Sequence, residues 1–289
     1  MRRTIAATVV AVALLAACSS DDSSGDAATS STSTTTPSTT TTTSIASTLQ
    51  AGDQYVALGS SIASGFGISE QSTDCGRSSR DYGRLVAAKF HLAFTDVSCG
   101  AAVVANVVDT PQGTNPPQIT ALTKDTKLVT VSVGGNDINY NGTAVVCGDP
   151  ASVCTAPPAL DANLATTATA IRAMVTKIEA AAPKATIVFI TYPREVPEGN
   201  CPAMSFTDAE AAVVRDMGSK LEQLFVSFGH DEKDVVFVDP YVAPGDHTGC
   251  APASARWTAG HVPDDGFAYH PTALGHEVMA RMIEQALGR

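Results

Sequence analysis

The chain has 289 residues, of which 44% are hydrophobic and 16% are charged, and its formal net charge is −11. An acidic chain without a cluster of basic residues is not expected to bind nucleic acid, nor to adhere to a membrane through its charge. Its length and apolar content are sufficient for one large domain with a buried core.

The amino terminus has the features of a bacterial secretory signal. Residues 1–3 are a short basic start, and residues 4–17 are an almost wholly apolar stretch that is too short to span a bilayer. The segment ends in Leu-Ala-Ala-Cys, which resembles a lipobox, the motif whose cysteine is acylated and becomes the mature amino terminus. We therefore expect cleavage after residue 17 and lipidation of Cys18. An ordinary signal peptide with an incidental cysteine is the alternative.

A tether and a single domain follow. Residues 18–50 are rich in Ser and Thr and poor in large apolar side chains, so they cannot bury enough surface to offset the entropy of ordering. Residues 51–289 form the expected domain. The predicted location is the outer face of the cell membrane or envelope, attached by lipid alone or partly released, and we expect a monomer.

Six cysteines remain in the domain once Cys18 is set aside. An even number of cysteines in an exported protein favours three disulfides over free thiols, although six cysteines allow fifteen pairings. A metal site is not expected, because no pair of cysteines or histidines has the spacing of zinc ligands. We favour pairing in sequence order: Cys75 with Cys99, Cys147 with Cys154, and Cys201 with Cys250.

Strands and helices alternate along the domain. Short apolar runs that stop at Gly, Ser or Pro predict strands, and longer stretches with apolar residues every three or four positions predict helices. The expected strands are residues 55–58, 93–97, 128–133, 185–192 and 235–238, and the expected helices are residues 82–90, 160–182, 207–228 and 270–287. This order predicts an α/β/α sandwich with a central, mostly parallel five-stranded sheet of the flavodoxin type.

Residues suited to acyl transfer follow the predicted strands. Ser61 comes directly after the first strand and could act as a nucleophile. The Gly100 amide and the Asn136 side chain follow two others and could stabilise an oxyanion. His270 lies at the start of the last predicted helix, where the helix dipole would disfavour the imidazolium and keep the ring ready to accept a proton. No cofactor is required for this chemistry.

Four blocks, in this order, resemble those of the SGNH (GDSL-type) hydrolases. They are Gly59-Ser60-Ser61, the glycine at 100, Gly134-x-Asn136-Asp137 and His270-Pro271. The resemblance covers the domain from residue 54 and is strongest to the secreted actinobacterial esterases and lipases, which carry three disulfides. It implies an ester hydrolase with Ser61 as nucleophile and His270 as base. Its oxyanion hole would contain the Ser61 amide, Gly100 and Asn136.

Two positions depart from the family pattern. The residue before the nucleophile is usually aspartate and is Ser60 here, which we expect to alter the support of the loop rather than the chemistry. The acid that orients the histidine usually lies three residues before it, where this chain has Phe267. Either the backbone carbonyl of Phe267 orients His270, as in some secreted relatives, or Asp264 or Asp265 does so.

Other residues and functions remain as alternatives. His261 is a competing base, whereas His276 is expected to be a packing or surface residue. Residues 230–234 and the pair Asp246-His247 look like metal ligands but are expected to be solvated loops, and Trp257 is expected in the core. Two further functions are an acyltransferase to a sugar or glycolipid at the same site and a non-catalytic lipoprotein that binds glycans or lipids.

Overall fold

The computed structural model describes residues 49–72, 74–232 and 234–288. The predictions for the signal peptide, for Cys18 and for the tether up to residue 48 fall outside these residues.

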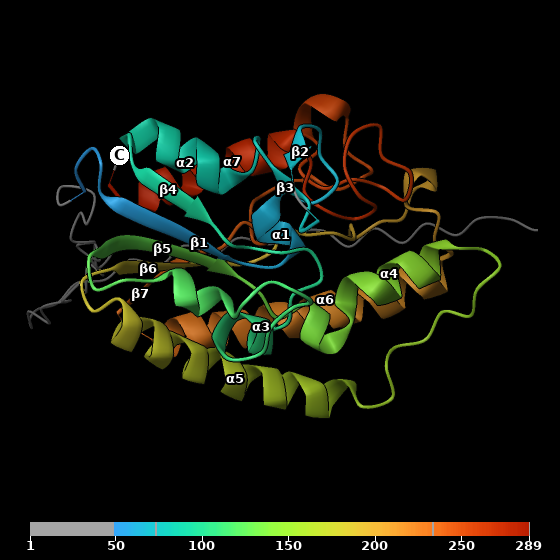
Figure 1. Ribbon diagram of the computed structural model, residues 1–289. Helices are drawn as coiled ribbons and strands as arrows, with labels where there is room; N and C mark the ends of the chain where they lie inside the picture. The colour runs from blue at the N-terminus through green and yellow to red at the C-terminus, as the bar shows by residue number, and fades with distance from the viewer. Residues whose placement is uncertain (1–48, 73, 233, 289) are drawn as a thin grey trace, which may run out of the picture. The chain divides into compact units, whose positions relative to one another are not determined.

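A five-stranded parallel sheet forms the centre of the domain, as predicted (Figure 1). The strand order is β4-β1-β5-β6-β7, so the chain starts in the sheet interior, moves to one edge and then crosses to the other. The strands are β1 (Gln54–Gly59), β4 (Ala93–Asp96), β5 (Thr126–Ser132), β6 (Thr186–Ile190) and β7 (Val235–Val238). A separate antiparallel pair consists of β2 (Gln71–Ser72) and β3 (Arg77–Ser78).

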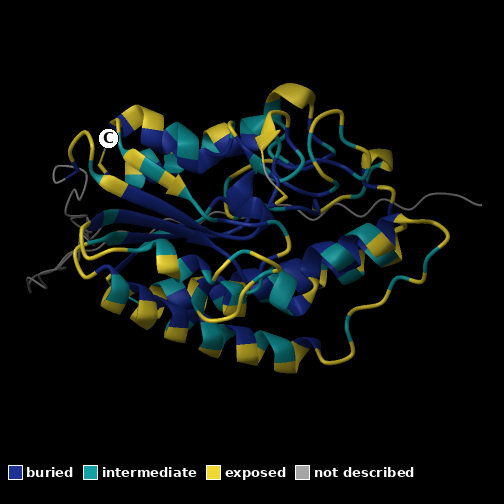
Figure 2. Ribbon diagram, in the orientation of Figure 1, coloured by how far each residue is buried: buried dark blue, intermediate teal, exposed yellow. Residues whose placement is uncertain are grey.

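Helices cover both faces of this sheet, which confirms the three-layer architecture. In Figure 1, α2 and α7 lie on one side of the sheet, and α3, α5 and α6 lie on the other. The helices are α1 (Ser61–Ser64), α2 (Tyr82–Phe90), α3 (Val104–Val108), α4 (Tyr140–Gly148), α5 (Leu160–Ala181), α6 (Asp208–Asp231) and α7 (Ala273–Ala286). Figure 2 shows the central strands β1, β5 and β6 mostly buried between these layers, while the edge strand β4 and the outward faces of the helices are partly exposed.

The apolar strands pack against the helices because parallel strands are buried on both faces. Phe189 of β6 illustrates this packing: its ring lies 5.3 Å from that of Phe225 and 4.9 Å from that of Phe228, both on α6. Among the described residues, every helix is too short or too polar to cross a membrane.

Two helix predictions need correction. No helix was expected between the strand at 128–133 and the helix at 160–182, but α4 forms there. The last helix was expected to start at His270 with Pro271 in its first turn, whereas α7 begins at Ala273. Thr272 is the cap, because its side-chain oxygen accepts a hydrogen bond from the Gly275 amide at 3.1 Å.

Three disulfides connect the loops of the domain, in the sequence order that we favoured. They join Cys75 to Cys99, Cys147 to Cys154, and Cys201 to Cys250. The first joins the segment between β1 and α2 to the loop that follows β4, beside the candidate active site.

Candidate active site

Ser61 lies at the sharp turn between β1 and α1. Gly59 ends the strand with a φ of 131°, a conformation that residues with side chains rarely adopt, and Ser61 is the first residue of α1. The hydroxyl of Ser61 is nearly buried, with 6% of the residue exposed. The Ser61 amide has no acceptor among the described residues, since it belongs to the first turn of a helix.

His270 lies beside this serine although 209 positions separate them in the sequence. Its Nε2 is 2.8 Å from the Ser61 Oγ, and its Nδ1 is 2.9 Å from the carbonyl oxygen of Ala268. A carbonyl oxygen can only accept a hydrogen bond, so Nδ1 carries the proton and Nε2 is free to accept one. The pair therefore has the arrangement of a nucleophile and its base.

The group that orients His270 is a carbonyl, but not the one expected. The Phe267 carbonyl accepts the His270 amide at 3.1 Å in a turn, so it is directed away from the ring, and Ala268 supplies the contact instead. Neither aspartate takes part. Asp265 accepts hydrogen bonds from the amide and hydroxyl of Ser69, and both ring nitrogens of His270 are paired without Asp264.

Burial sets the protonation of His270. The residue is 3% exposed, and desolvation lowers the pKa of its imidazole to about 4, while the bond to Ala268 acts weakly in the opposite direction. The helix dipole was expected to be the cause. Since α7 begins three residues later, burial replaces it as the main cause.

This pKa predicts an unusual pH profile. His270 must be neutral to accept the serine proton, so kcat/KM on a soluble ester should be retained down to about pH 5 and fall by half near pH 4. An ordinary histidine would give a midpoint near 6.5. A stopped assay in buffers of constant ionic strength measures the midpoint, with circular dichroism at each pH to verify that the protein is folded. A midpoint between pH 6 and 7 would contradict the assignment of the buried His270, with its lowered pKa, as the base.

Not all of the candidate oxyanion donors are free to bind a substrate. The Gly100 amide donates to the Cys75 carbonyl at 2.9 Å, so it is not available to a substrate. The next residue, Ala101, has a φ of 63° and lies beside Ser61 and His270 in the lining of one cleft. The Ala101 amide has no acceptor among the described residues. Asn136 donates one of its two Nδ2 hydrogens to the Ala102 carbonyl at 2.9 Å, which leaves the other free.

A largely apolar cleft of about 360 Å³ opens onto these groups. The rings of Phe66 and Phe267 form one wall, with centroids 5.3 Å apart, and Val145 of α4 contributes to the lining. The cleft residues come from α1, α4 and the loops at the carboxyl edge of the sheet, where ligands of open α/β sheets bind. They are Ser61, Phe66, Gly100, Ala101, Asn136, Asn141, Gly142, Val145, Phe267 and His270.

Ser60, which stands where the family has aspartate, supports the loop. It is fully buried, and its hydroxyl lies 3.4 Å from both the Tyr192 hydroxyl and the Ser132 carbonyl. The Tyr192 hydroxyl also accepts the Gly135 amide at 3.0 Å, so one tyrosine connects the loops after β1 and β5. Sequence reasoning missed Tyr192, because a buried tyrosine after a strand has no distinguishing pattern.

Three further histidines make contacts outside the site. The Nδ1 of His261 lies 3.1 Å from the Tyr269 hydroxyl. His276 accepts a hydrogen bond from the Tyr82 amide and stacks on the Tyr82 ring, as expected of a packing residue. His247 lies between two backbone carbonyls and stacks on Trp257 at 3.7 Å. Among the described residues, no group of three acidic, cysteine or histidine side chains could hold a metal ion.

A three-layer α/β/α fold, with a serine and a histidine paired at the carboxyl edge of its sheet, defines a hydrolase of the SGNH class. A profile of the GDSL-like lipase/acylhydrolase family matches residues 57–278, and the chain belongs to this family. It is a carboxylic ester hydrolase.

The relatives of this chain include proteins named as lipases. The chain is 29% identical over 261 residues to Lipase 2 of Streptomyces coelicolor, a match that covers 81% of this chain and 85% of that one. It is 27% identical over 237 residues to a lipase of Streptomyces rimosus, which covers 80% and 84% of the two chains.

Solved structures share the fold. An extracellular lipase from Streptomyces rimosus superimposes with a TM-score of 0.65 at 23% identity, covering 81% of this chain and 100% of that one. A phospholipase A1 from Streptomyces albidoflavus gives a TM-score of 0.64 at 25% identity, covering 82% and 100%.

Proposed function

We propose that this protein is an exported serine esterase that hydrolyses carboxylic esters through an acyl-enzyme on Ser61. The observation that carries the proposal is the 2.8 Å contact between the Ser61 Oγ and the unprotonated Nε2 of His270. A buried imidazole in its neutral form, within hydrogen-bonding distance of a serine hydroxyl, is what general-base activation of serine requires.

The reaction has two halves. As the Ser61 Oγ attacks the ester carbon, its proton passes to Nε2 of His270, and the substrate carbonyl oxygen becomes an oxyanion. The amides of Ser61 and Ala101 and the free Nδ2 hydrogen of Asn136 stabilise that charge. When the tetrahedral intermediate collapses, His270 returns the proton to the departing alcohol. Water then attacks the acyl-enzyme in the same way and releases the acid.

The Ala268 carbonyl performs one task of a triad carboxylate. It accepts the Nδ1 proton, which fixes the tautomer and the orientation of the ring. It has no full negative charge with which to stabilise the imidazolium. We therefore regard the site as a serine–histidine dyad with a backbone carbonyl as the orienting group.

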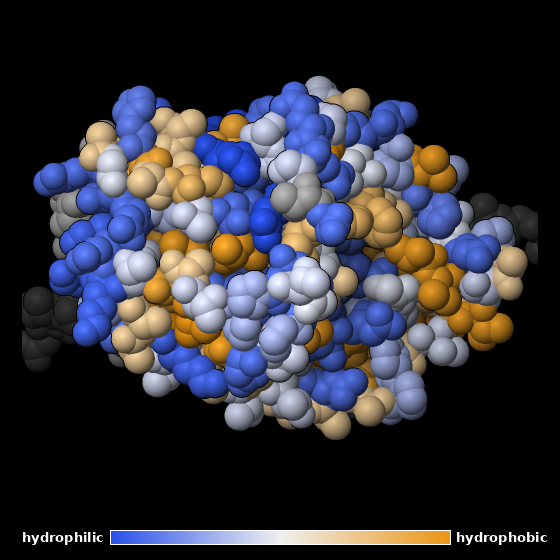
Figure 3. Space-filling model, in the orientation of Figure 1, coloured by the Kyte–Doolittle hydropathy of each residue, from blue (hydrophilic) through white to orange (hydrophobic). Residues whose placement is uncertain are grey.

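The apolar cleft favours the acyl chain of a lipid-like ester. Figure 3 shows hydrophobic side chains gathered over α4 and the segment after it, and in that region Val146 and Val153 are 46% and 83% exposed. Val145, next to the first of these, lines the cleft. An apolar surface beside an apolar cleft suits a substrate with a hydrocarbon chain.

Export is the second part of the proposal. Three disulfides are typical of proteins that fold in an oxidising compartment, which agrees with the secretory features of residues 1–17. We retain lipidation of Cys18, the tether up to residue 50 and a domain over 51–289 as proposals.

Turnover of p-nitrophenyl esters of increasing chain length tests this function. We expect free carboxylic acid as the product, with rates that rise from acetate to medium-length chains as the cleft fills. The same reaction with added sugar or glycerol distinguishes hydrolysis from transfer, and a predominant acylated acceptor would contradict the hydrolase assignment. A folded protein without turnover on any ester would contradict the esterase assignment.

A further inference from the structure

The turn that carries the proposed Ala101 donor has two possible forms. The Ala102 amide donates to the Cys99 carbonyl at 3.1 Å, so residues 99–102 are a β-turn with Gly100 and Ala101 at its centre. Ala101 has a positive φ of 63°, and Gly100 is not among the glycines of positive φ, which are the signs of a type II turn. A type I turn has the same ends, but its central peptide is rotated.

That central peptide contains the oxyanion donor. The Gly100 carbonyl and the Ala101 amide belong to one planar trans unit, so their C=O and N–H bonds point in opposite directions. Whatever holds the Gly100 oxygen on one side therefore directs the Ala101 hydrogen to the other. Rotation to the type I form would turn this hydrogen away from its present direction.

Alanine at position 101 disfavours the type II turn that the structure shows. Type II turns favour glycine at this position because φ is positive, whereas alanine prefers the negative φ of a type I turn. Left to local preferences, the Gly100–Ala101 peptide would rotate. A contact from elsewhere in the chain must therefore stabilise the observed form.

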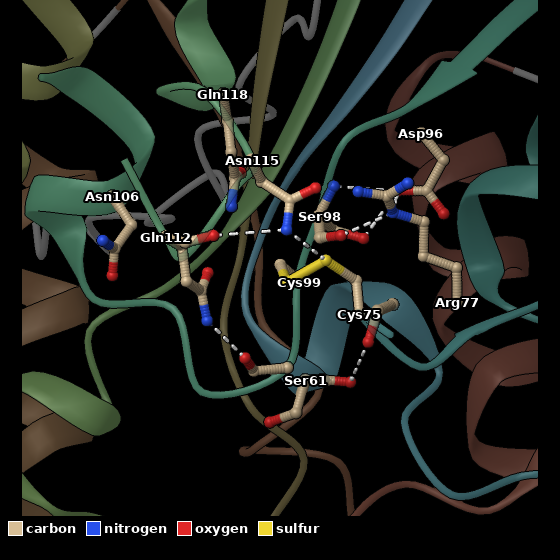
Figure 4. The surroundings of a disulfide bond; sticks show 12 residues. Ser61, Cys75, Arg77, Asp96, Ser98, Cys99, Asn106, Gln112, Asn115 and Gln118 are labelled. Atoms are coloured by element: carbon tan, nitrogen blue, oxygen red, sulfur yellow. Dashed lines mark hydrogen bonds and ion pairs between the residues drawn. A yellow bond between two sulfur atoms is a disulfide. The ribbon is translucent and has the colours of Figure 1, made fainter. Parts of the chain in front are cut away.

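Gln112 makes this contact. Its Nε2 donates to the Gly100 carbonyl at 2.7 Å. Gln112 is itself held by a tight turn, since its amide and carbonyl both bond to Asn115 at 3.0 Å, with Gly113 between them at a φ of 61°. Figure 4 shows Gln112, Asn115 and the Cys75–Cys99 disulfide grouped near Ser61.

The other contacts of the loop hold its ends and not its centre. The Gly100 amide bonds to Cys75, whose sulfur is joined to Cys99, and Asn136 holds the Ala102 carbonyl. Each of these groups lies outside the Gly100–Ala101 peptide. In the described part of the chain, the Gln112 side chain is what bonds to that peptide.

We propose that Gln112 is a positioning residue for the oxyanion hole: its bond to the Gly100 carbonyl selects the type II turn and directs the Ala101 amide into the cleft. This role rests on the proposed esterase function. A hydrogen bond and the strain of alanine at positive φ each correspond to a factor of roughly five to ten in an equilibrium. Loss of the bond should therefore place most molecules in the rotated form.

The test compares Gln112→Leu with Gln71→Leu, a matched control. Gln71 also donates its Nε2 to a carbonyl, that of Ile68 at 3.1 Å, but outside the oxyanion loop. We expect Gln112→Leu to lower kcat/KM for p-nitrophenyl acetate about tenfold, less than the loss of a whole oxyanion donor. Phenylboronic acid, which forms a tetrahedral adduct with serine, should bind about tenfold more weakly. Gln71→Leu should leave both values within twofold of the parent protein.

A second substitution separates positioning from general damage. Glycine at 101 removes the strain of the type II turn. The double variant with Ala101→Gly and Gln112→Leu should therefore have a kcat/KM at least three times that of Gln112→Leu alone. Rates are expressed per active site, counted by complete reaction with a fluorophosphonate, so that partly folded preparations remain comparable. Gln112→Met serves as a second variant without the donor.

Three outcomes overturn the proposal. One is a kcat/KM for Gln112→Leu within twofold of Gln71→Leu, and another is unchanged boronate affinity. The third is a loss that Ala101→Gly does not reverse, because a merely structural role for Gln112 would behave in that way. Failure of the esterase function itself is distinguishable, since the parent protein would then show no Ser61-dependent turnover.

Discussion

Replacing Ser61 with alanine is expected to lower kcat on p-nitrophenyl esters by roughly a million-fold, the usual effect of removing a serine nucleophile. The reason is that no acyl-enzyme can form, while the oxyanion donors and the cleft remain. The Ser61 hydroxyl makes its described hydrogen bond to His270 alone, so the melting temperature should change little. Burst and steady-state kinetics on the purified variant measure the effect.

The adjacent serine provides a matched control. Ser60 is equally small and buried, but its hydroxyl contacts Tyr192 and the Ser132 carbonyl at 3.4 Å, a distance that indicates weak bonds. Ser60→Ala should therefore retain activity within about tenfold, because its role is to support the loop. Equal losses in the two variants would show that the loop, rather than the Ser61 hydroxyl, accounts for the effect.

Replacing Gly59 with alanine is expected to lower the free energy of unfolding by at least about 3 kcal/mol, from backbone strain together with steric overlap. A Cβ at this position would lie 2.2 Å from the Ser132 carbonyl oxygen and 3.0 Å from the Ala63 Cβ. The Ser132 oxygen cannot withdraw easily, since it accepts the Ser60 amide at 2.9 Å. The Gly59 φ of 131° adds strain for any residue with a side chain.

Gly52→Ala is the control for this prediction. Gly52 also has a positive φ, 87°, but a Cβ there would meet no atom within 4 Å. Urea denaturation should thus give a loss of only about 1 kcal/mol for Gly52→Ala. A similarly small loss for Gly59→Ala would mean that β1 and β5 can separate at their carboxyl ends, contrary to the close approach described above.

The sheet was predictable because each strand is a short apolar run with a clear end. Residues 128–133 are all apolar or Thr and Ser, and Gly134 follows, so both the burial and the end of β5 are visible in the sequence. The parallel arrangement follows from the helices between strands. The order in which the strands pair was not predicted, because it depends on which helix covers which face of the sheet.

Helix α4 was missed because its own sequence is a poor helix former. It contains Gly142, Thr143 and two adjacent valines, which all have low helix propensity. Packing accounts for the helix: Tyr140 lies against Gly218 of α6, where even a Cβ would come within 2.5 Å of the tyrosine hydroxyl. Tertiary contacts of this kind leave no local pattern.

The site shows a similar division. Ser61, Asn136 and His270 could be predicted as candidates from residue type and order, because the proposed chemistry needs those side chains. The proposed roles of Ala268 and Ala101 rest on backbone groups, and every residue except proline has both a carbonyl and an amide hydrogen. Which of them faces the site depends on the local turn, as the hydrogen bond between the Phe267 carbonyl and the His270 amide illustrates. The backbone groups that we propose therefore lie one residue from those expected from the sequence.

The most direct test of the esterase mechanism is the mass of the peptide that a fluorophosphonate modifies. Peptide mapping of the labelled protein should place one phosphonyl group on Ser61, and Ser61→Ala should remain unlabelled while Ser60→Ala is labelled. A phosphonyl group on any other residue, or labelling that survives in Ser61→Ala, would contradict the assignment of Ser61 as the nucleophile.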